Sequence, residues 1–141
     1  MRRALLVIAA ALGLAACEAE TRGVQMIAAP IGPGDEIAPD AVVVELFDRV
    51  CLRTGARVSD ARQVLAGLPV RENPETGTHF HQTYNLSFNP ARRDGRDLCS
   101  IVTYTADPAK LGSRLAAIAQ SKGLEARIRP SDDGYLNVVV R

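Results

Sequence analysis

The chain contains 141 residues, of which 17 are basic and 16 are acidic. That length allows one compact domain with a tail but is too short for two ordinary domains. A charge balance this close to neutral lacks the positive excess of nucleic-acid-binding domains, so we exclude nucleic acid as a partner. Aromatic residues make up only 4% of the chain and tryptophan is absent, which argues against a large stacking surface for sugars or nucleobases.

The first 17 residues have the layout of a secretion signal. Arg2 and Arg3 precede an apolar run at residues 4–12, which suits a signal peptide but is too short to span a bilayer. The run leads to the sequence Leu-Ala-Ala-Cys at residues 14–17, which resembles the lipobox of bacterial lipoproteins. The resemblance implies cleavage after residues 1–16, a diacylglycerol on the Cys17 thiol and an acyl chain, such as palmitate, on its amine.

The lipobox resemblance also implies a location and a membrane contact. We expect a lipid-anchored protein on the periplasmic side of the envelope, and Glu18 after the cysteine favours the outer membrane. Three acyl chains anchor a protein far more firmly than one. Ordinary secretory cleavage nearby is the alternative. Without Arg2 and Arg3 the chain has 15 basic and 16 acidic residues, a net charge of −1.

Two cysteines remain once the lipobox has taken Cys17. Because an exported protein enters an oxidising compartment, we predict a disulfide between Cys51 and Cys99. This disulfide would close a loop of 48 residues, which in the chain-entropy model adds about 4 kcal/mol to the free energy of unfolding. A redox-active or metal-binding pair is the alternative, but the sequence has no Cys-x-x-Cys spacing that would favour it.

Residues 17–39 are predicted to be a flexible tether between the lipid and the domain. Proline and glycine interrupt regular structure repeatedly from Pro30 to Pro39, and about 20 flexible residues span on the order of 25 Å. Alternatively, Val24–Ile27 forms an edge strand of the sheet and is not part of the tether. The folded domain is expected to comprise residues 40–141.

The domain begins with two predicted helices. The first starts near Asp40 and stops before Gly55, because apolar residues recur at helical spacing. Its buried face contains Val43, Leu46, Phe47, Val50 and Cys51. The second is predicted over residues 59–68, with Ser59 as its N-cap and Pro69 after its end.

A polar loop at residues 71–78 separates these helices from a predicted strand at residues 79–88. The alternation places Phe80, Tyr84, Leu86 and Phe88 on a buried face, interrupted by Gln82, and His79, His81, Thr83, Asn85 and Ser87 on a solvent face. A turn at Asp94-Gly95 leads into a returning strand from Cys99 to Thr105.

A third helix and a second hairpin complete the predicted domain. Asp107 and Pro108 are a typical helix start, and Gly123 a typical end. Strands follow at residues 124–129 and 135–140. The order is α-α-β-β-α-β-β, which predicts a single α+β domain with helices on one face of a four-stranded antiparallel sheet.

The sharpest candidate site is the pair His79 and His81. Two residues apart on a strand, both imidazoles project from one face and can share zinc or copper. The sequence does not fix the third ligand, for which Glu72, Glu75 and Asp94 are the candidates. The alternative is a pair of polar residues on a solvated strand face.

Arginines form a second, weaker candidate. Arg92, Arg93 and Arg96 surround the turn at Asp94 and suit either an anion or lipid-headgroup contact or a solvated turn. Arg127 and Arg129 alternate with apolar residues, as on the exposed side of an ordinary strand. Serine-nucleophile and phosphate-loop motifs are absent from the sequence.

The domain also resembles small exported proteins of alphaproteobacteria. The resemblance is carried by the runs at residues 46–52, 71–74, 79–82 and 98–102. It supports the paired cysteines and implies no activity. We therefore expect a non-enzymatic, lipid-anchored module that binds a protein or another component of the envelope through the Arg71–Thr78 loop and the His79/His81 face. The alternative is a metal-binding or metal-dependent protein centred on these histidines; a small hydrolase has no catalytic grouping to support it.

Overall fold

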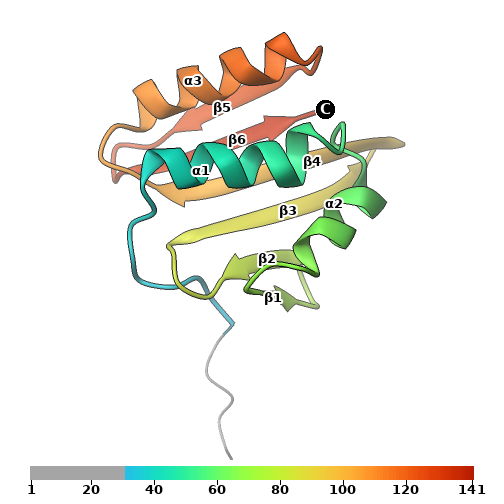
Figure 1. Cartoon of the computed structure of the whole chain (residues 1–141), viewed down its shortest axis with the longest axis horizontal. Helices are drawn as coiled ribbons and strands as arrows, with labels where there is room; N and C mark the ends of the chain where they lie inside the picture. Colours follow the sequence, from blue (N-terminus) through green and yellow to red (C-terminus); the bar gives the residue numbers. More distant parts are fainter. Residues whose placement is uncertain (1–30) are drawn as a thin grey trace, which may run out of the picture.

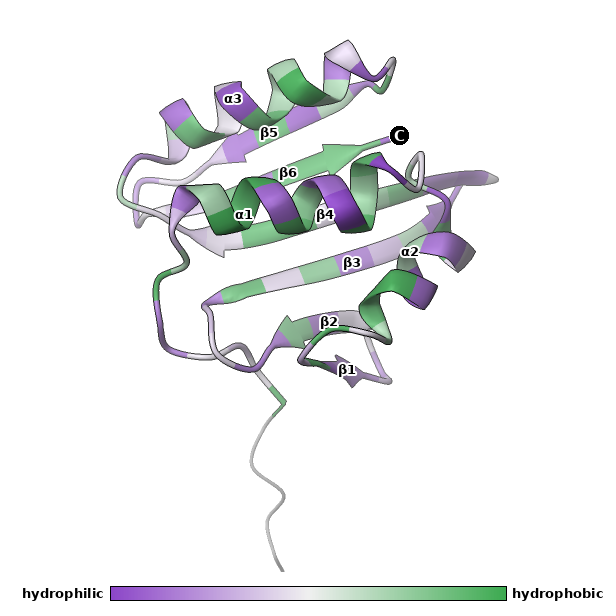
Figure 2. Cartoon of the chain, viewed as in Figure 1, coloured by the Kyte–Doolittle hydropathy of each residue, from purple (hydrophilic) through white to green (hydrophobic). Residues whose placement is uncertain are grey.

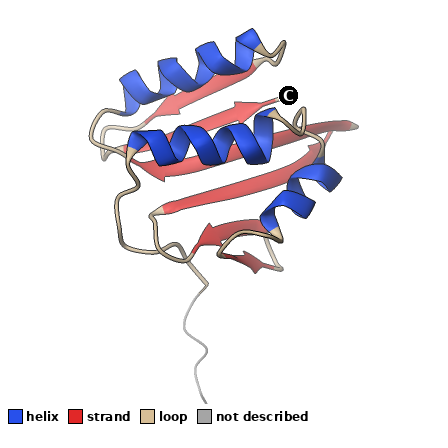
Figure 3. Cartoon of the chain, in the orientation of Figure 1, coloured by secondary structure: helices blue, strands red, loops and turns tan. Residues whose placement is uncertain are grey.

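The computed structural model describes residues 31–141, so the signal, Cys17 and the segment Val24–Ile27 lie outside the described residues. Residues 31–141 form a six-stranded antiparallel sheet in the order β1-β2-β3-β4-β6-β5. Three helices lie on one face of this sheet (Figure 1, Figure 3). We call the face under the helices the covered face and the opposite one the open face.

The elements follow the chain in a simple order. The first helix, α1 (Asp40–Phe47), continues into the π-helical turn η1 (Asp48–Leu52) and is followed by α2 (Val58–Leu65). Four strands come next: β1 (Val70–Asn73), β2 (Thr78–His81), β3 (Leu86–Arg93) and β4 (Arg96–Tyr104). The chain ends with α3 (Pro108–Ser121), β5 (Ala126–Pro130) and β6 (Tyr135–Val140).

The predicted α+β class and the placement of the helices on one face of an antiparallel sheet are confirmed. Within residues 31–141 the sheet has two more strands than the four predicted. Both additional strands arise from the segment 70–88, because Val70–Asn73 turns back at residues 74–77 and pairs with Thr78–His81. The polar turn was predicted correctly, but its flanks belong to the sheet.

The predicted faces of the segment 79–88 are wrong for the histidines. This segment is two strands, and β2 pairs with β3 so that His79 lies opposite Phe88 and Phe80 opposite Ser87. Residues opposite each other in an antiparallel pair share a face. His79 and His81 are therefore on the covered face, only 6% and 5% exposed, and Phe80 is on the open face. The chain reversal after Gln82 exchanges the two faces.

The core lies between the helices and the covered face. Phe88, Ile101 and Val138 form one row across the sheet and are fully buried. Phe47 and Leu115 approach them from the helices and are also fully buried. Hydrophobic and hydrophilic residues alternate along the helices (Figure 2), as expected for helices that cover a sheet with one face.

The predicted disulfide between Cys51 and Cys99 is present. It joins η1 to β4 with a Cα–Cα distance of 5.4 Å and closes a loop of 48 residues. Both cysteines are fully buried. The bridge thus fastens the helical layer to the middle of the sheet.

The folded domain extends further toward the N-terminus than the sequence indicates. The Gly34 amide donates to the His81 carbonyl at 2.8 Å, and the Glu36 amide donates to the Thr83 carbonyl at 3.1 Å. Glu36 also accepts a hydrogen bond from the Asn85 amide at 2.7 Å. Residues 34–38 therefore pack against the β2–β3 connection, although the sequence assigns them to the tether.

The start of α3 follows its prediction. The Asp107 side chain accepts a hydrogen bond from the Lys110 amide at 3.0 Å, and Pro108 occupies the first turn. No helix within residues 31–141 has the length and apolar character needed to cross a membrane.

Candidate functional site

The open face is the largest surface of the sheet that no helix covers. One row of side chains crosses all six strands of the described sheet on this face, because each of its members pairs with the next. It comprises Arg71, Phe80, Ser87, Val102, Asn137 and Arg129. The neighbouring row includes Asn89, Ser100, Val139 and Arg127. The middle of the face is thus partly apolar, and arginines lie toward both edges.

Positive charge dominates the open face. The strand positions that face outward carry five exposed arginines, which we call the open-face arginines: Arg71, Arg93, Arg96, Arg127 and Arg129. In residues 31–141 none of the five forms an ion pair. The outward positions of the six described strands hold no aspartate or glutamate. These guanidinium groups are therefore available to an anionic ligand.

The Glu125 carboxylate lies beside this surface and is already paired with Arg141. Glu125, just before β5, receives two hydrogen bonds from the Arg141 guanidinium, each 2.8 Å long. The Arg141 hydrogen bond lowers the pKa of the Glu125 carboxyl despite partial desolvation, and the charges of Arg127 and Arg96 lower it further. Arg96 from β4 and Arg127 from β5 each line a hollow together with Arg141, so open-face arginines from both strands lie at this end of the sheet.

A shallow hollow of about 280 Å³ lies between arginines of the open face. Arg93 lines it from β3, and Arg127 and Arg129 line it from β5. Its floor includes Asn137 and Val139. The side-chain oxygen of Asn137 is buried there without a hydrogen-bond donor from the described residues, and such an atom costs free energy unless a ligand or solvent satisfies it.

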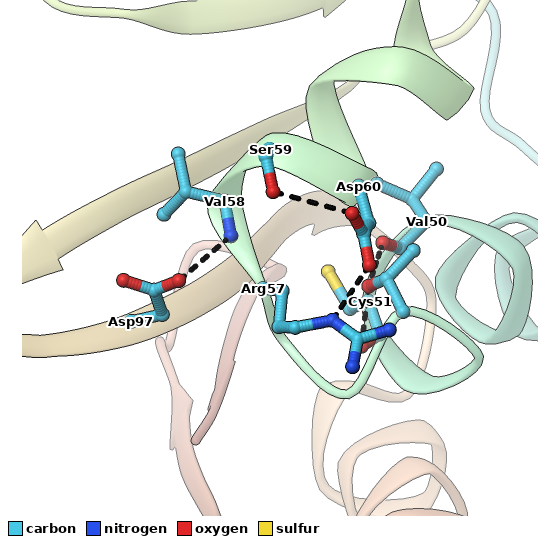
Figure 4. A network of polar contacts seen from close by, with 8 residues as sticks. Val50, Cys51, Arg57, Val58, Ser59, Asp60 and Asp97 are labelled. Atoms are coloured by element: carbon cyan, nitrogen blue, oxygen red, sulfur yellow. Dashed lines mark hydrogen bonds and ion pairs between the residues drawn. The ribbon is translucent and has the colours of Figure 1, made fainter.

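The three arginines that line a hollow on the helical side differ, because each has an acidic partner. Arg53 is 2.6 Å from Asp48, and Arg57 is 2.6 Å from Asp60; the second contact is visible in Figure 4. Arg49 pairs more loosely with Glu45, at 3.9 Å. Burial acts to raise the pKa of Asp48, but hydrogen bonds from Lys122 and Arg53 outweigh it and lower the pKa. These arginines line a hollow of about 510 Å³, and Asp60 lines it with them. Carboxylates therefore already neutralise the positive charge around this hollow.

The same region corrects the predicted start of α2. Ser59 is not the N-cap, because the helix begins one residue earlier, with Arg57 in the N-cap position. The Ser59 hydroxyl donates to Asp60 within the helix (Figure 4). The first amide of the helix, that of Val58, donates to the Asp97 carboxylate at 3.1 Å. Asp97 belongs to β4 and is 39 residues away in sequence. A long-range contact thus replaces the local cap.

The His81 side chain is hydrogen bonded to the backbone of the β2–β3 connection. Its Nδ1 atom accepts hydrogen bonds from the amides of Thr83 and Tyr84, each at 3.1 Å. Its ring lies 4.9 Å from the ring of Tyr84. Burial lowers the pKa of His81 below its ordinary value of 6.5, because charging a buried imidazole is unfavourable. The neutral ring therefore holds the β2–β3 turn together.

His79 has a different environment on the same strand. Its Nδ1 atom is 3.1 Å from the Gly77 carbonyl, and its Nε2 atom is 3.7 Å from the Glu72 carboxylate. Glu72 lies directly opposite His79 in the β1–β2 pair. A hollow of about 250 Å³ adjoins this pair, with Arg62 from α2 among its lining residues.

The histidine pair does not fit the expected metal site. Of the predicted third ligands, only Glu72 lies near either imidazole. Across the described residues 31–141, no three His, Cys, Asp or Glu side chains are grouped closely enough to hold a metal ion. Because the Nδ1 atom of His81 already accepts two backbone amides, that nitrogen has no lone pair left for a metal.

The predicted arginine cluster is divided between two environments. Arg92 lies 3.7 Å from Asp97 and donates to the Gly95 carbonyl, so it belongs to the turn. Arg93 and Arg96 point to the open face, where β4 and β6 bring them close to the arginines of β5. The sequence gives only one hint of this convergence, the alternation of Arg127 and Arg129 with apolar residues.

The chain was also compared with known proteins. No family model, no curated protein and no solved structure matches it.

Proposed function

We propose that the chain is a lipid-anchored, non-enzymatic binding module on the periplasmic side of the bacterial envelope, attached to the outer membrane. Its open face binds an anionic component of the envelope. The observation that carries the proposal is the set of five open-face arginines, none of which has an acidic partner in the described residues. Unpaired guanidinium groups on an uncovered face favour carboxylate and phosphate ligands.

Two observations support the proposed location in the envelope. The sequence at residues 14–17 resembles a lipobox, in which Cys17 would be the acylation site, and the disulfide between Cys51 and Cys99 is typical of proteins in oxidising compartments. The residues between Cys17 and Gly34 would then form the tether. If flexible, a segment of this length spans about 22 Å, which lets the domain reach partners near the membrane surface.

The arrangement of the nucleophilic groups favours binding over catalysis. Within residues 31–141 neither imidazole is hydrogen bonded to a hydroxyl or thiol group that it could activate. Cys51 and Cys99 are joined to each other, so neither offers a thiolate.

The anchor is tested by metabolic labelling with palmitate in the native host. We expect the wild-type chain to incorporate label and to fractionate with outer membranes, and the Cys17→Ala variant to remain an unlabelled precursor. Labelling that persists in Cys17→Ala would refute the anchor at this residue.

The binding face is tested by photo-crosslinking in the intact envelope. A photoreactive phenylalanine analogue is placed at Phe80 on the open face, with a matched probe at the exposed Gln63 on α2. We expect an adduct from Phe80 alone, lost when Arg127 and Arg129 are both changed to glutamine and weakened by added salt. Equal adducts from both positions would contradict an open-face binding site.

The metal-binding alternative has a separate test. If His79 and His81 held zinc or copper, purified mature protein would bind about one ion at micromolar exposure, and a double alanine variant would lose it. We expect no stoichiometric binding, because the described residues near the pair supply only Glu72 as a further ligand. Elemental analysis after dialysis distinguishes the two results.

A further inference from the structure

We propose that the hollow between Arg93, Arg127 and Arg129 binds a phosphate ester whose alcohol part carries a free hydroxyl group, such as a glycerol or sugar phosphate. This inference rests on the proposed function, because it names the ligand of the same open face. The glycerol headgroup of a phospholipid is a phosphodiester with one negative charge, and a soluble glycerol or sugar phosphate is a monoester; both carry a phosphate group and a free hydroxyl group. The experiment below distinguishes the two sources.

The arrangement of charge points to phosphate. Arg93 and the two arginines of β5 stand on strands separated by β4 and β6, a span of about 14 Å between backbones. Their side chains line one hollow from opposite sides. Several guanidinium groups around one site exceed what a single carboxylate can pair with, whereas a phosphate monoester offers three acceptor oxygens and up to two negative charges.

The floor of the hollow points to an alcohol. The buried side-chain oxygen of Asn137 lacks a donor from the described residues, and because Asn137 lines the hollow, rotation of its amide toward the hollow would let a ligand hydroxyl supply one. Ser100 and Asn89 add further polar groups beside it. The apolar side chains of Val139 and Leu98 line the same hollow and can contact the carbon atoms of a small alcohol.

The hollow on the helical side provides the internal comparison. It is larger, at about 510 Å³, and it also contains three arginines, Arg49, Arg53 and Arg57. Each of these already faces a carboxylate, so an incoming phosphate would have to displace an existing partner. Only the open-face hollow combines arginines without acidic partners in the described residues with an unsatisfied polar floor.

The experiment uses the chain from Glu18 onward, which retains every helix and strand of the described structure and the disulfide. Binding of sn-glycerol 3-phosphate is measured by calorimetry, with glycerate as the matched carboxylate. A second arm measures binding to phosphatidylcholine vesicles with and without phosphatidylglycerol. The test variant is R127Q/R129Q, and R49Q/R57Q removes the same charge from the helical side.

We expect saturable binding of glycerol 3-phosphate, tighter than that of glycerate, which R127Q/R129Q weakens at least about tenfold. We expect R49Q/R57Q to bind like the wild type, and Asn137→Leu to weaken glycerol 3-phosphate but not inorganic phosphate. The same variant pattern on phosphatidylglycerol vesicles assigns the lipid headgroup as the source. The pattern on the soluble ester alone assigns a free phosphate ester.

Three results would overturn the inference. They are no saturable binding to either probe, equal binding of glycerate and glycerol 3-phosphate, and equal losses in the two double variants. A different result would refute the proposed function. It is the absence, in the intact envelope, of an adduct at Phe80 that depends on Arg127 and Arg129. An adduct without phosphate binding would leave the binding module in place and remove only its ligand.

Discussion

The two faces of the sheet have opposite physical characters, although they are made by the same strands. The centre of the covered face is apolar and fully buried, and the Cys51–Cys99 disulfide fastens this face to the helices. The open face is partly apolar and carries five arginines, which have no acidic partner in residues 31–141. The packed core therefore lies on one face, and positive charge without ion pairs lies on the other.

The comparison also shows why net charge conceals the site. Residues 31–141 contain 14 basic and 14 acidic side chains, so the domain is neutral as a whole. On the helical side, Arg53 and Arg57 form ion pairs with Asp48 and Asp60. The open-face arginines form no ion pair in residues 31–141, so a neutral domain presents one positive face.

Truncating one phenylalanine on each face tests this division most strongly. Phe88 on the covered face is fully buried, whereas Phe80 on the open face is only half-buried. We expect Phe88→Ala to lower the free energy of unfolding by about 3 to 5 kcal/mol, and Phe80→Ala by less than about 2 kcal/mol. Urea unfolding of both variants measures the difference. Similar losses would mean that the open face also contributes to the core.

Removing the disulfide tests how firmly the covered face is held. We expect the Cys51→Ala/Cys99→Ala variant to lose about 4 kcal/mol, because its unfolded chain is no longer restricted by a closed loop. Thiol titration of the native protein checks the bridge directly. Two reactive thiols without reductant would refute it.

The close approach of α3 to the sheet is tested at Gly112. A Cβ atom there would lie 2.5 Å from the Cγ2 atom of Ile128 and 3.0 Å from Leu136. We expect Gly112→Ala to destabilise the domain by about 1 to 3 kcal/mol. Gly67→Ala is the control, since its nearest such contact is 3.6 Å. Equal stability of the two variants in thermal unfolding would contradict the packing of α3.

The buried imidazole predicts a pH dependence on the covered side. Because the folded-state pKa of His81 lies below 6.5, protonation favours the unfolded chain. The stability of the wild type relative to His81→Gln should be constant above about pH 7 and should decrease as the pH falls through the unfolded-state value toward the folded-state value. Denaturant titrations from about pH 8 to about pH 5 measure this difference. A difference that grows on acidification would show that the ring is charged in the folded state.

The smallest expected effect compares one arginine from each side. Arg57→Gln breaks an exposed ion pair with Asp60, so we expect a loss of at most about 1 kcal/mol. Arg127→Gln breaks no ion pair in the described structure and removes only the attraction to the exposed Glu125 carboxylate, so we expect a smaller loss than in Arg57→Gln. A larger loss in Arg127→Gln would indicate a closer partner for this arginine and would weaken the binding proposal.

Local signals in the sequence predicted most of the helices. Apolar spacing located α1 with η1, and the Asp107-Pro108 start located α3. The start of α2 was predicted incorrectly because the first amide of the helix donates to Asp97 of β4, a contact that no local pattern reveals. The histidines were assigned to the wrong face because a turn after Gln82 reverses the chain where alternation suggested one strand.

By itself, the sequence determined the α+β class, the positions of the main helices and the pairing of Cys51 with Cys99, because these depend on local periodicity and on the number of cysteines. Only the tertiary structure decided which side chains share a face. Strand register brings Arg93 within one hollow with Arg127 and Arg129, more than 30 residues away in the chain. Register also buries His79 and His81, because pairing between distant strands fixes which face each residue occupies.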